Sequence, residues 1–313
     1  MNRRVKADLA LVLCSVIWGA SFVVVKFILL NSSPLVFMAL RFTLASLVML
    51  PLYRRGLRKM NRAEFWAGVV TGMSLFGGYI FQTAGLVTTS ASKGAFITGS
   101  SVAMVPILLL IFWRRAIGPA VWAGVAAAFV GLYFLTVPGG GTQGLVRGDF
   151  LVLIGAVAFA LQIIFVSVYG ARHEAGSLGF MQIATTAALS LLLLPVGALT
   201  RLQPARLHWN PLLAWAVAAT AVLATAATFS MQAWGQQFTT ATHAALIFAL
   251  EPVMAAVTAR LVSGERLSAR AIAGAVLILA GILLAEIRPR AARRGEGENC
   301  AEQAPAPIGC PPS

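Results

Sequence analysis

Long apolar stretches follow one another along almost the whole chain, separated by short polar or Gly- and Pro-containing segments. A helix needs about 20 predominantly apolar residues to cross a bilayer. The stretches lack the apolar–polar alternation of membrane β-strands, so helices are expected. The expected spans are, in order, 8–29, 34–53, 65–85, 92–113, 119–137, 149–169, 178–199, 211–232, 240–262 and 268–287. This pattern predicts an all-α fold, a polytopic membrane bundle of ten transmembrane helices.

Composition excludes a water-soluble fold. Hydrophobic residues make up 59% of the chain and charged residues 11%, and the mean hydropathy is +0.84, far above that of soluble domains. The net charge of +14 does not indicate nucleic-acid binding, because Lys and Arg beside spans are what membrane insertion requires. Most of these cations fall on one side if the N-terminus is inside, so both termini are predicted to be cytoplasmic. The expected location is the inner (plasma) membrane of the cell.

The first five spans are echoed by the last five. At a constant offset of 141 residues, the matches are Asp8 with Asp149, Trp18-Gly19 with Phe159-Ala160 and Arg41 with Gln182. At an offset of 150, they are Gln82 with Gln232, Gly85 with Gly235 and Thr89–Lys93 with Thr239–His243. Polar residues that repeat in register are not explained by shared membrane composition. Since five is an odd number, the second copy starts from the opposite side, which predicts two inverted five-helix repeats.

The repeat defines the expected organisation of the chain. Residues 1–7 form a cytoplasmic N-terminal arm, 8–137 the first repeat and 149–287 the second. The Gly-rich segment 138–148 is the connector. The tail 288–313 is Pro-rich and charged without apolar periodicity, so we expect it to be a disordered cytoplasmic segment.

Several short motifs resemble a known family. The motifs are Trp18-Gly19-Ala20-Ser21-Phe22 with Lys26, Arg41-Phe42, Thr89–Lys93 with Pro106, Thr240-Ala241-Thr242, Glu251-Pro252, Gly264-Glu265-Arg266-Leu267 and Gly274. With them the chain resembles the EamA-domain permeases of the drug/metabolite transporter superfamily, over roughly residues 8–287. The resemblance implies a ten-helix permease that moves amino acids, purine-like compounds, sugars or other metabolites. It adds Trp18 to the candidate substrate-binding residues.

The two halves are not expected to be perfectly symmetric. An offset of 150 carries Pro252 back to Val102, whereas the first half has its proline at Pro106. Proline removes a helical hydrogen bond and kinks the chain. The sequence therefore predicts kinks displaced by about one helical turn, roughly 5.4 Å.

Glu251 and Arg41 are the charges that a membrane makes expensive. Glu251 lies in the middle of its span, where such residues usually face a cavity or a partner, and Pro252 frees the carbonyl of Phe248 beside it. Two interpretations stay open for Glu251, a binding or protonatable site in the pathway and a structural ion pair with Arg41 or Lys26. Arg41 is expected mainly to bond helix-end carbonyls, with a role in substrate binding as the alternative. Lys26 is expected to reach the headgroups.

Gln82 and Gln232 are the most attractive symmetric pair. An amide both donates and accepts hydrogen bonds, so it can hold a polar solute without carrying charge. Tyr79 lies three residues before Gln82 and Phe229 three before Gln232, on the same helix faces. An aromatic ring beside an amide in each half suits an amphipathic solute. The alternative is that these amides only join neighbouring helices.

No catalytic or metal-binding constellation is found in the sequence. His173, His208 and His243 share no metal-ligand spacing, and no Gly-rich pattern follows a strand, so no nucleotide or other cofactor is expected. His243 matches Lys93 at the start of the equivalent helix and is interpreted as a cap or loop residue. Cys14 and the tail residues Cys300 and Cys310 do not suggest a disulfide framework.

The sequence therefore predicts a transporter and not an enzyme. Without an ATPase motif, transport must be secondary active or facilitative, with protons as a candidate coupling ion. The expected partners are the lipid bilayer and a small organic metabolite, and the resemblance favours an amino acid or related compound and efflux over uptake. Two alternatives stay open, a membrane-embedded enzyme acting on lipid-linked substrates and a non-transporting membrane partner protein.

Overall fold

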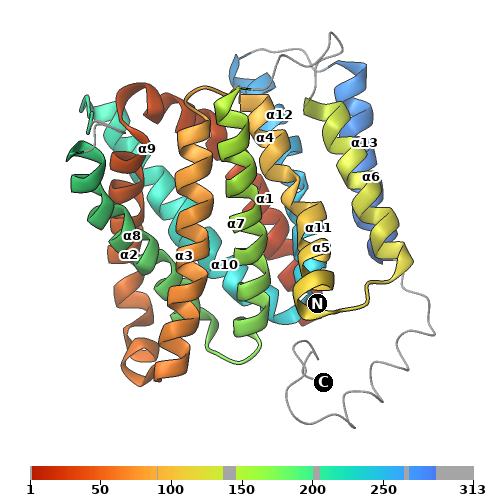
Figure 1. Ribbon diagram of the computed structural model, residues 1–313, viewed down its shortest axis with the longest axis horizontal. Coiled ribbons are helices and arrows are strands. Elements are labelled where there is room, and N and C mark those ends of the chain that lie inside the picture. The colour runs from red at the N-terminus through yellow and green to blue at the C-terminus, as the bar shows by residue number, and fades with distance from the viewer. Residues whose placement is uncertain (1, 90, 137–145, 200–204, 264–267, 287–313) are drawn as a thin grey trace.

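A computed structural model describes residues 2–89, 91–136, 146–199, 205–263 and 268–286. In this part of the chain the regular structure is helical, apart from one isolated antiparallel bridge between Ser32 and Leu207. The helices are, in chain order, α1 (Arg3–Asn31), α2 (Pro34–Lys59), α3 (Arg62–Gly85), α4 (Ala91–Gly99), α5 (Ser101–Trp113), α6 (Pro119–Thr136), α7 (Arg147–Gly170), α8 (Ala175–Leu199), α9 (Pro211–Ala221), the π-helix η1 (Val222–Ala227), α10 (Thr228–Gly235), the 3₁₀ turn η2 (Gln236–Phe238), α11 (Ala241–Phe248), α12 (Leu250–Ser263) and α13 (Ala269–Glu286). Figure 1 shows them as one bundle. The expected tail 288–313, most of the connector 138–148 and the Gly264–Leu267 motif lie outside the described residues.

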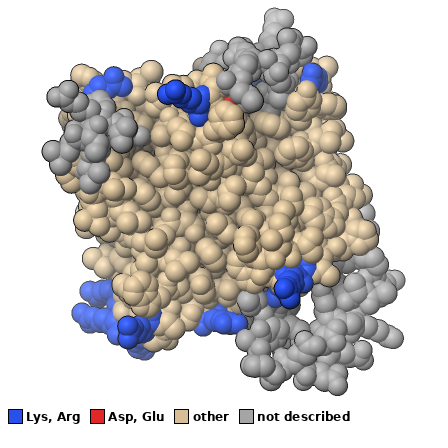
Figure 2. All heavy atoms as spheres, in the orientation of Figure 1, with Lys and Arg blue, Asp and Glu red and all other residues tan. Residues whose placement is uncertain are grey.

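The all-helical prediction is confirmed, and the helices are built for a bilayer. Seven helical segments of the described chain are long and apolar enough to cross a membrane, and α6 and α13 are apolar but shorter. Large apolar side chains such as Leu52, Phe112 and Leu283 are strongly exposed. On the face drawn in Figure 2, the coloured Lys and Arg residues lie toward the two ends, with a band of uncharged residues between them. A soluble protein would not leave such a band uncovered.

Short polar signals set the ends of the helices. Asn61 and Asn210 cap α3 and α9, and the side chain of each accepts a hydrogen bond from a backbone N–H of the first turn. The helix α2 runs to Lys59, beyond the predicted end at residue 53. The apolar pattern could not show this, because a helix can continue past the bilayer through the basic residues that follow residue 53.

Close helix packing uses glycine where two backbones approach. A Cβ atom on Gly131 would lie 2.6 Å from the carbonyl oxygen of Gly274, and one on Gly124 would lie 2.5 Å from that of Gly281. These contacts join α6 to α13, which lie side by side at one edge of the bundle (Figure 1). These glycines therefore serve close helix packing.

Two helices are interrupted at matching places, which corrects the predicted asymmetry. The fourth expected span breaks at Ser100, between α4 and α5, and the ninth breaks at Ala249, between α11 and α12. The predicted displacement of about one turn is therefore wrong. In the second half, the ring of Pro252 excludes the helical bond to Phe248. In the first half, the break precedes Pro106 at Gly99 and Ser100, which are poorer helix formers, and the Ser100 hydroxyl donates to Ile97 O at 2.5 Å.

Candidate substrate cavity

A cavity of about 90 Å³ lies within the bundle, between α1, α2, α3, α4, α7, α10 and the α11–α12 interruption. A buried water needs about 10–15 Å³, so this space holds several waters or part of a small solute. All seven candidate residues of the sequence line it. They are Trp18, Arg41, Tyr79, Gln82, Phe229, Gln232 and Glu251. Residues more than 200 positions apart in the chain therefore share one site.

Arg41 is almost fully buried, with 3% of its surface exposed, and its guanidinium is held by the second half of the chain. Nε donates to Thr225 Oγ1 at 2.6 Å, and Nη2 donates to Ala224 O at 2.9 Å and to Tyr79 Oη at 3.5 Å. The guanidinium carbon also lies 5.0 Å from the centre of the Tyr79 ring. The expected carbonyl contact exists, but the carbonyl belongs to the π-helix η1 and not to a helix end.

Aromatic rings form the walls of the cavity. The Trp18 ring centre lies 5.2 Å from those of Phe229 and Phe248. The Tyr79 ring packs edge-on against Phe159 at 5.2 Å. Trp18 Nε1 donates to Ala224 O at 3.1 Å and to Thr228 Oγ1 at 2.9 Å, so its polar edge is satisfied and its apolar faces remain for packing or for a solute.

The two predicted glutamines line the same cavity but have different partners. Gln82 Nε2 donates to Thr98 Oγ1 at 2.9 Å. Gln232 exchanges hydrogen bonds with Gln162, at 3.1 and 3.3 Å, and Gln162 also donates to Gln182 Oε1 at 2.9 Å. Gln232 therefore fits both interpretations, because it lines the cavity and its amide also joins α10 to α7.

Gln162 and Phe159 are cavity residues that the sequence analysis missed as candidates. The signal was present, since the offset of 141 that matches Trp18 with Phe159 also matches Ser21 with Gln162. Ser21 lines the cavity too. The match was not informative on its own, because serine and glutamine are unlike residues.

Glu251 lies in the first turn of α12, directly after the interruption at Ala249. Among the residues that the structure describes, no cation lies within the 4.0 Å of an ion pair with it. Gly19 allows α1 to pack closely against the start of α12, because a Cβ atom on Gly19 would lie 2.5 Å from the carbonyl oxygen of Glu251. The carboxylate therefore shares the cavity with Arg41 without a direct salt bridge.

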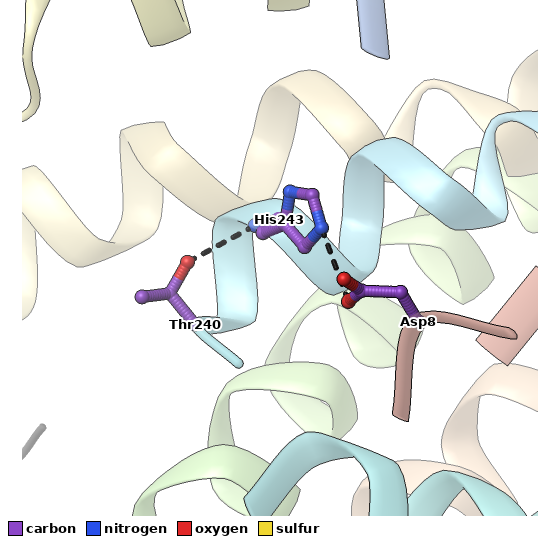
Figure 3. A network of polar contacts seen from close by, with 3 residues as sticks. All are labelled: Asp8, Thr240 and His243. Carbon is purple, nitrogen blue, oxygen red and sulfur yellow. Dashed lines mark hydrogen bonds and ion pairs between the residues drawn. The ribbon is translucent and has the colours of Figure 1, made fainter. Parts of the chain in front are cut away.

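An aspartate makes a polar contact at each end of the bundle. At one end, His243 Nε2 lies 3.3 Å from Asp8 Oδ1 (Figure 3), a contact that is an ion pair only when the imidazole carries a charge. The His243 backbone N–H also donates to Thr240 Oγ1, so Thr240 is the cap of α11. His243 itself lies in the first turn of the helix, and its interpretation as a cap or loop residue is wrong. At the other end, the Thr89 hydroxyl donates to Asp149 Oδ1 at 3.0 Å. Asp8 and Asp149 are equivalent positions at the offset of 141, but their partners are not, because Thr89 matches Thr239 and not His243.

The course of the chain brings the start of α1 and the end of α7 to the same end of the bundle. Asp8, in the first turns of α1, contacts the start of α11. The end of α7 lies there too, because Gln237 Nε2, just before α11, donates to Gly170 O at 2.7 Å. Conversely, Gly148 at the start of α7 packs against Gly85 at the end of α3.

Comparison with known proteins identifies the family. The model of the EamA-like transporter family matches the chain twice, over residues 5–137 and 146–286. The chain belongs to the EamA-like transporter family. The two matches show that the chain contains two copies of the family's repeat.

Relatives of this EamA-like chain are transporters by name. An uncharacterized transporter of Archaeoglobus fulgidus is 33% identical over 286 residues, which cover 91% of this chain and 87% of the relative. The uncharacterized transporter YyaM of Bacillus subtilis is 27% identical over 280 residues, covering 87% and 90%. A protein solved by crystallography has the same fold, with a TM-score of 0.71, 20% identity and coverage of 93% of this chain and 98% of its own. The chain is thus a multi-pass membrane protein of a transporter family.

Proposed function

We propose that this EamA-like protein is a secondary transporter that moves a small amphipathic metabolite by alternating access between two inverted repeats. One observation carries the proposal: a guanidinium, a carboxylate, several amides and aromatic walls, contributed by both repeats, line one cavity in the bundle. Few convergent polar groups in a mainly apolar cavity are typical of small-molecule sites. The resemblance to the superfamily favours an amino acid or related compound, and efflux.

The chain topology supports ten crossings with opposite orientations of the two repeats. The start of α1 and the end of α7 lie at one end of the bundle, as two antiparallel copies require. We place both termini in the cytoplasm, because Lys and Arg gather at that end of the first repeat.

Transport by the purified full-length protein in liposomes tests the proposal. Amino acids, a purine nucleobase and a hexose, each radiolabelled, are measured as counterflow against the same unlabelled solute. We expect saturable exchange with at least one amino acid. Exchange no faster than in protein-free liposomes for every solute would contradict the proposed function.

The proposed topology predicts which added cysteines react from outside. The starting chain has Cys300 and Cys310 replaced by serine, and Cys14 is buried. A membrane-impermeant maleimide applied to intact cells should label His208→Cys and not Arg58→Cys. Both positions are exposed in the fold, so a difference reports the side of the membrane. Labelling of Arg58→Cys in intact cells would contradict the orientation.

The cavity amides should set affinity more than stability. We expect Gln82→Leu and Gln232→Leu each to raise the KM by about tenfold, since one lost hydrogen bond to a solute is worth about 1 kcal/mol or more. The folded yield in membranes should remain near that of the wild type for Gln82→Leu. Gln232→Leu also removes both hydrogen bonds with Gln162 and leaves Gln162 Oε1 without its donor, so the thermal stability of this variant should fall more. An unchanged KM in both variants would remove these amides from the site.

A further inference from the structure

The second repeat contains one residue more than the first in the helix that carries its cavity glutamine. The capping residues Asn61 and Asn210 are 149 positions apart, whereas the ends of the same helices, Gly85 and Gly235, are 150 apart. The helix α3 is regular between these points, but its counterpart contains η1, Val222–Ala227, between α9 and α10. A π-turn is how an α-helix absorbs an inserted residue, and such turns occur often at functional sites.

The π-turn offers hydrogen-bond acceptors to two cavity side chains from the first repeat. Ala224 O accepts from both Arg41 Nη2, at 2.9 Å, and Trp18 Nε1, at 3.1 Å. In a regular α-helix, each interior carbonyl is occupied by the backbone N–H four residues later. In a π-turn, backbone N–H groups bond the carbonyl five residues earlier. Where the helix returns to bonds four residues apart, one carbonyl receives no backbone N–H, and it is free to accept from side chains.

The hydroxyl of Thr225 is oriented for the same purpose. It donates its proton to Thr220 O, five residues earlier, at 2.9 Å. Its lone pairs are therefore left for a donor, and Arg41 Nε provides one at 2.6 Å. A hydroxyl has a single proton and two lone pairs, so this arrangement fixes Thr225 as an acceptor toward Arg41.

The regular helix of the first repeat shows what happens without the extra residue. Gln182 occupies the position in the second repeat that Arg41 occupies in the first, and it packs against α3 at Gly72. Its Nε2 is buried without a hydrogen-bond partner among the described residues. The regular α3 thus leaves a donor of Gln182 unsatisfied, whereas η1 satisfies two donors of Arg41.

We propose that η1 is the element that positions the binding site, with Thr225 and the carbonyl of Ala224 as positioning groups for Arg41 and Trp18. Within the described part of the chain, no residue accepts a hydrogen bond from Arg41 Nη1, and Arg41 lines the cavity. The π-turn therefore holds two guanidinium nitrogens and leaves the third to bind an anionic group of the solute, such as a carboxylate. This inference rests on the proposed transport function.

Three substitutions separate positioning from folding. Thr225→Val keeps the shape of the side chain and removes the acceptor, and Thr225→Ser keeps the hydroxyl. The control is Thr71→Val in α3, a fully buried threonine whose hydroxyl bonds only its own helix, at Ala67 O. In the liposome assay we expect Thr225→Val to raise the KM of the transported solute by about tenfold or more. Thr225→Ser and Thr71→Val should stay within about twofold of the wild type. A wild-type KM for Thr225→Val would overturn the inference.

Removal of Ala226 tests the extra residue itself. The deletion should convert η1 into regular α-helix and restore the offset of 149, so the protein should remain folded while transport is lost. If the turn only tolerates an insertion, the deletion variant should transport with the KM of the wild type, and this result would overturn the inference.

A measurement without any solute keeps this inference distinct from the transport proposal. Hydrogen–deuterium exchange of the wild type, Arg41→Gln and Thr71→Val proteins is followed in peptides that cover 222–231. We expect these peptides to exchange faster in Arg41→Gln than in the wild type, and not in Thr71→Val, because the hydrogen bonds of Arg41 stabilise η1. If Arg41→Gln exchanges faster but the wild type transports none of the solutes, the positioning role of η1 stands and the proposed function is refuted. Equal exchange in all three would overturn the positioning role.

Discussion

Replacing Arg41 with methionine should lower transport by about 100-fold or more, because charge-assisted hydrogen bonds are worth about 1.5–3 kcal/mol each and the variant loses the cavity's guanidinium. Arg41→Lys should not rescue it, since an ammonium cannot reproduce the planar arrangement that reaches Thr225 and Ala224 together. The measurement is initial-rate counterflow in liposomes, with the solute concentration varied.

The matched control for Arg41 is Lys26→Met, which removes an exposed cation from α1. It should leave transport unchanged. The free energy of unfolding in detergent should fall for Arg41→Met by no more than about 1–3 kcal/mol, because Ala224 O still accepts a hydrogen bond from Trp18. A stable Arg41→Met protein with the wild-type KM would exclude Arg41 from the binding site.

Glu251→Gln should abolish accumulation driven by a proton gradient and preserve counterflow. A carboxylate at this depth must be neutral, paired or hydrated, because bare ionisation in an apolar environment is too costly. Without a cation at ion-pair distance in the described structure, protonation is the simplest way to neutralise it. The amide keeps the size of the side chain but cannot release a proton, so the coupled step should fail first.

Two comparisons test the Glu251 prediction. The first is Glu64→Gln. Glu64 is a buried carboxylate outside the cavity that accepts a hydrogen bond from the Glu174 backbone N–H, and its replacement should preserve both activities. If Glu251 instead formed a structural pair with Arg41, the Gln variant would be unstable and Arg41→Leu would partly restore it. Full gradient-driven accumulation by a stable Glu251→Gln protein would refute both roles.

The sequence predicted the helical fold and the composition of the cavity because membrane physics leaves few alternatives. Apolar length sets the spans, and polar side chains within spans must meet one another or a cavity. The offset of 150 within the chain then identified Gln82 and Gln232 as a symmetric pair, and both line the cavity. The number of crossings and the orientation of the repeats stay predictions.

The features that the sequence did not predict depend on where the backbone departs from a regular helix. The motif Glu251-Pro252 explained one interruption, but the one at Ser100 was assigned to Pro106, a turn too late. The one-residue change between Asn210 and Gln232 was visible as an offset that shifts from 149 to 150. Sequence pattern does not reveal whether a loop or a π-turn absorbs such a residue, because both conserve the apolar face on either side.

The most direct test of the account is the two-sided accessibility of Ser21, which lines the cavity on α1. Ser21→Cys, in a chain with Cys300 and Cys310 replaced by serine, is labelled in oriented vesicles with an impermeant thiol reagent added to one side at a time. We expect labelling from both sides, and slower labelling from both when the transported solute is present. Labelling from one side only, unaffected by any solute that the protein carries, would contradict a central cavity with alternating access.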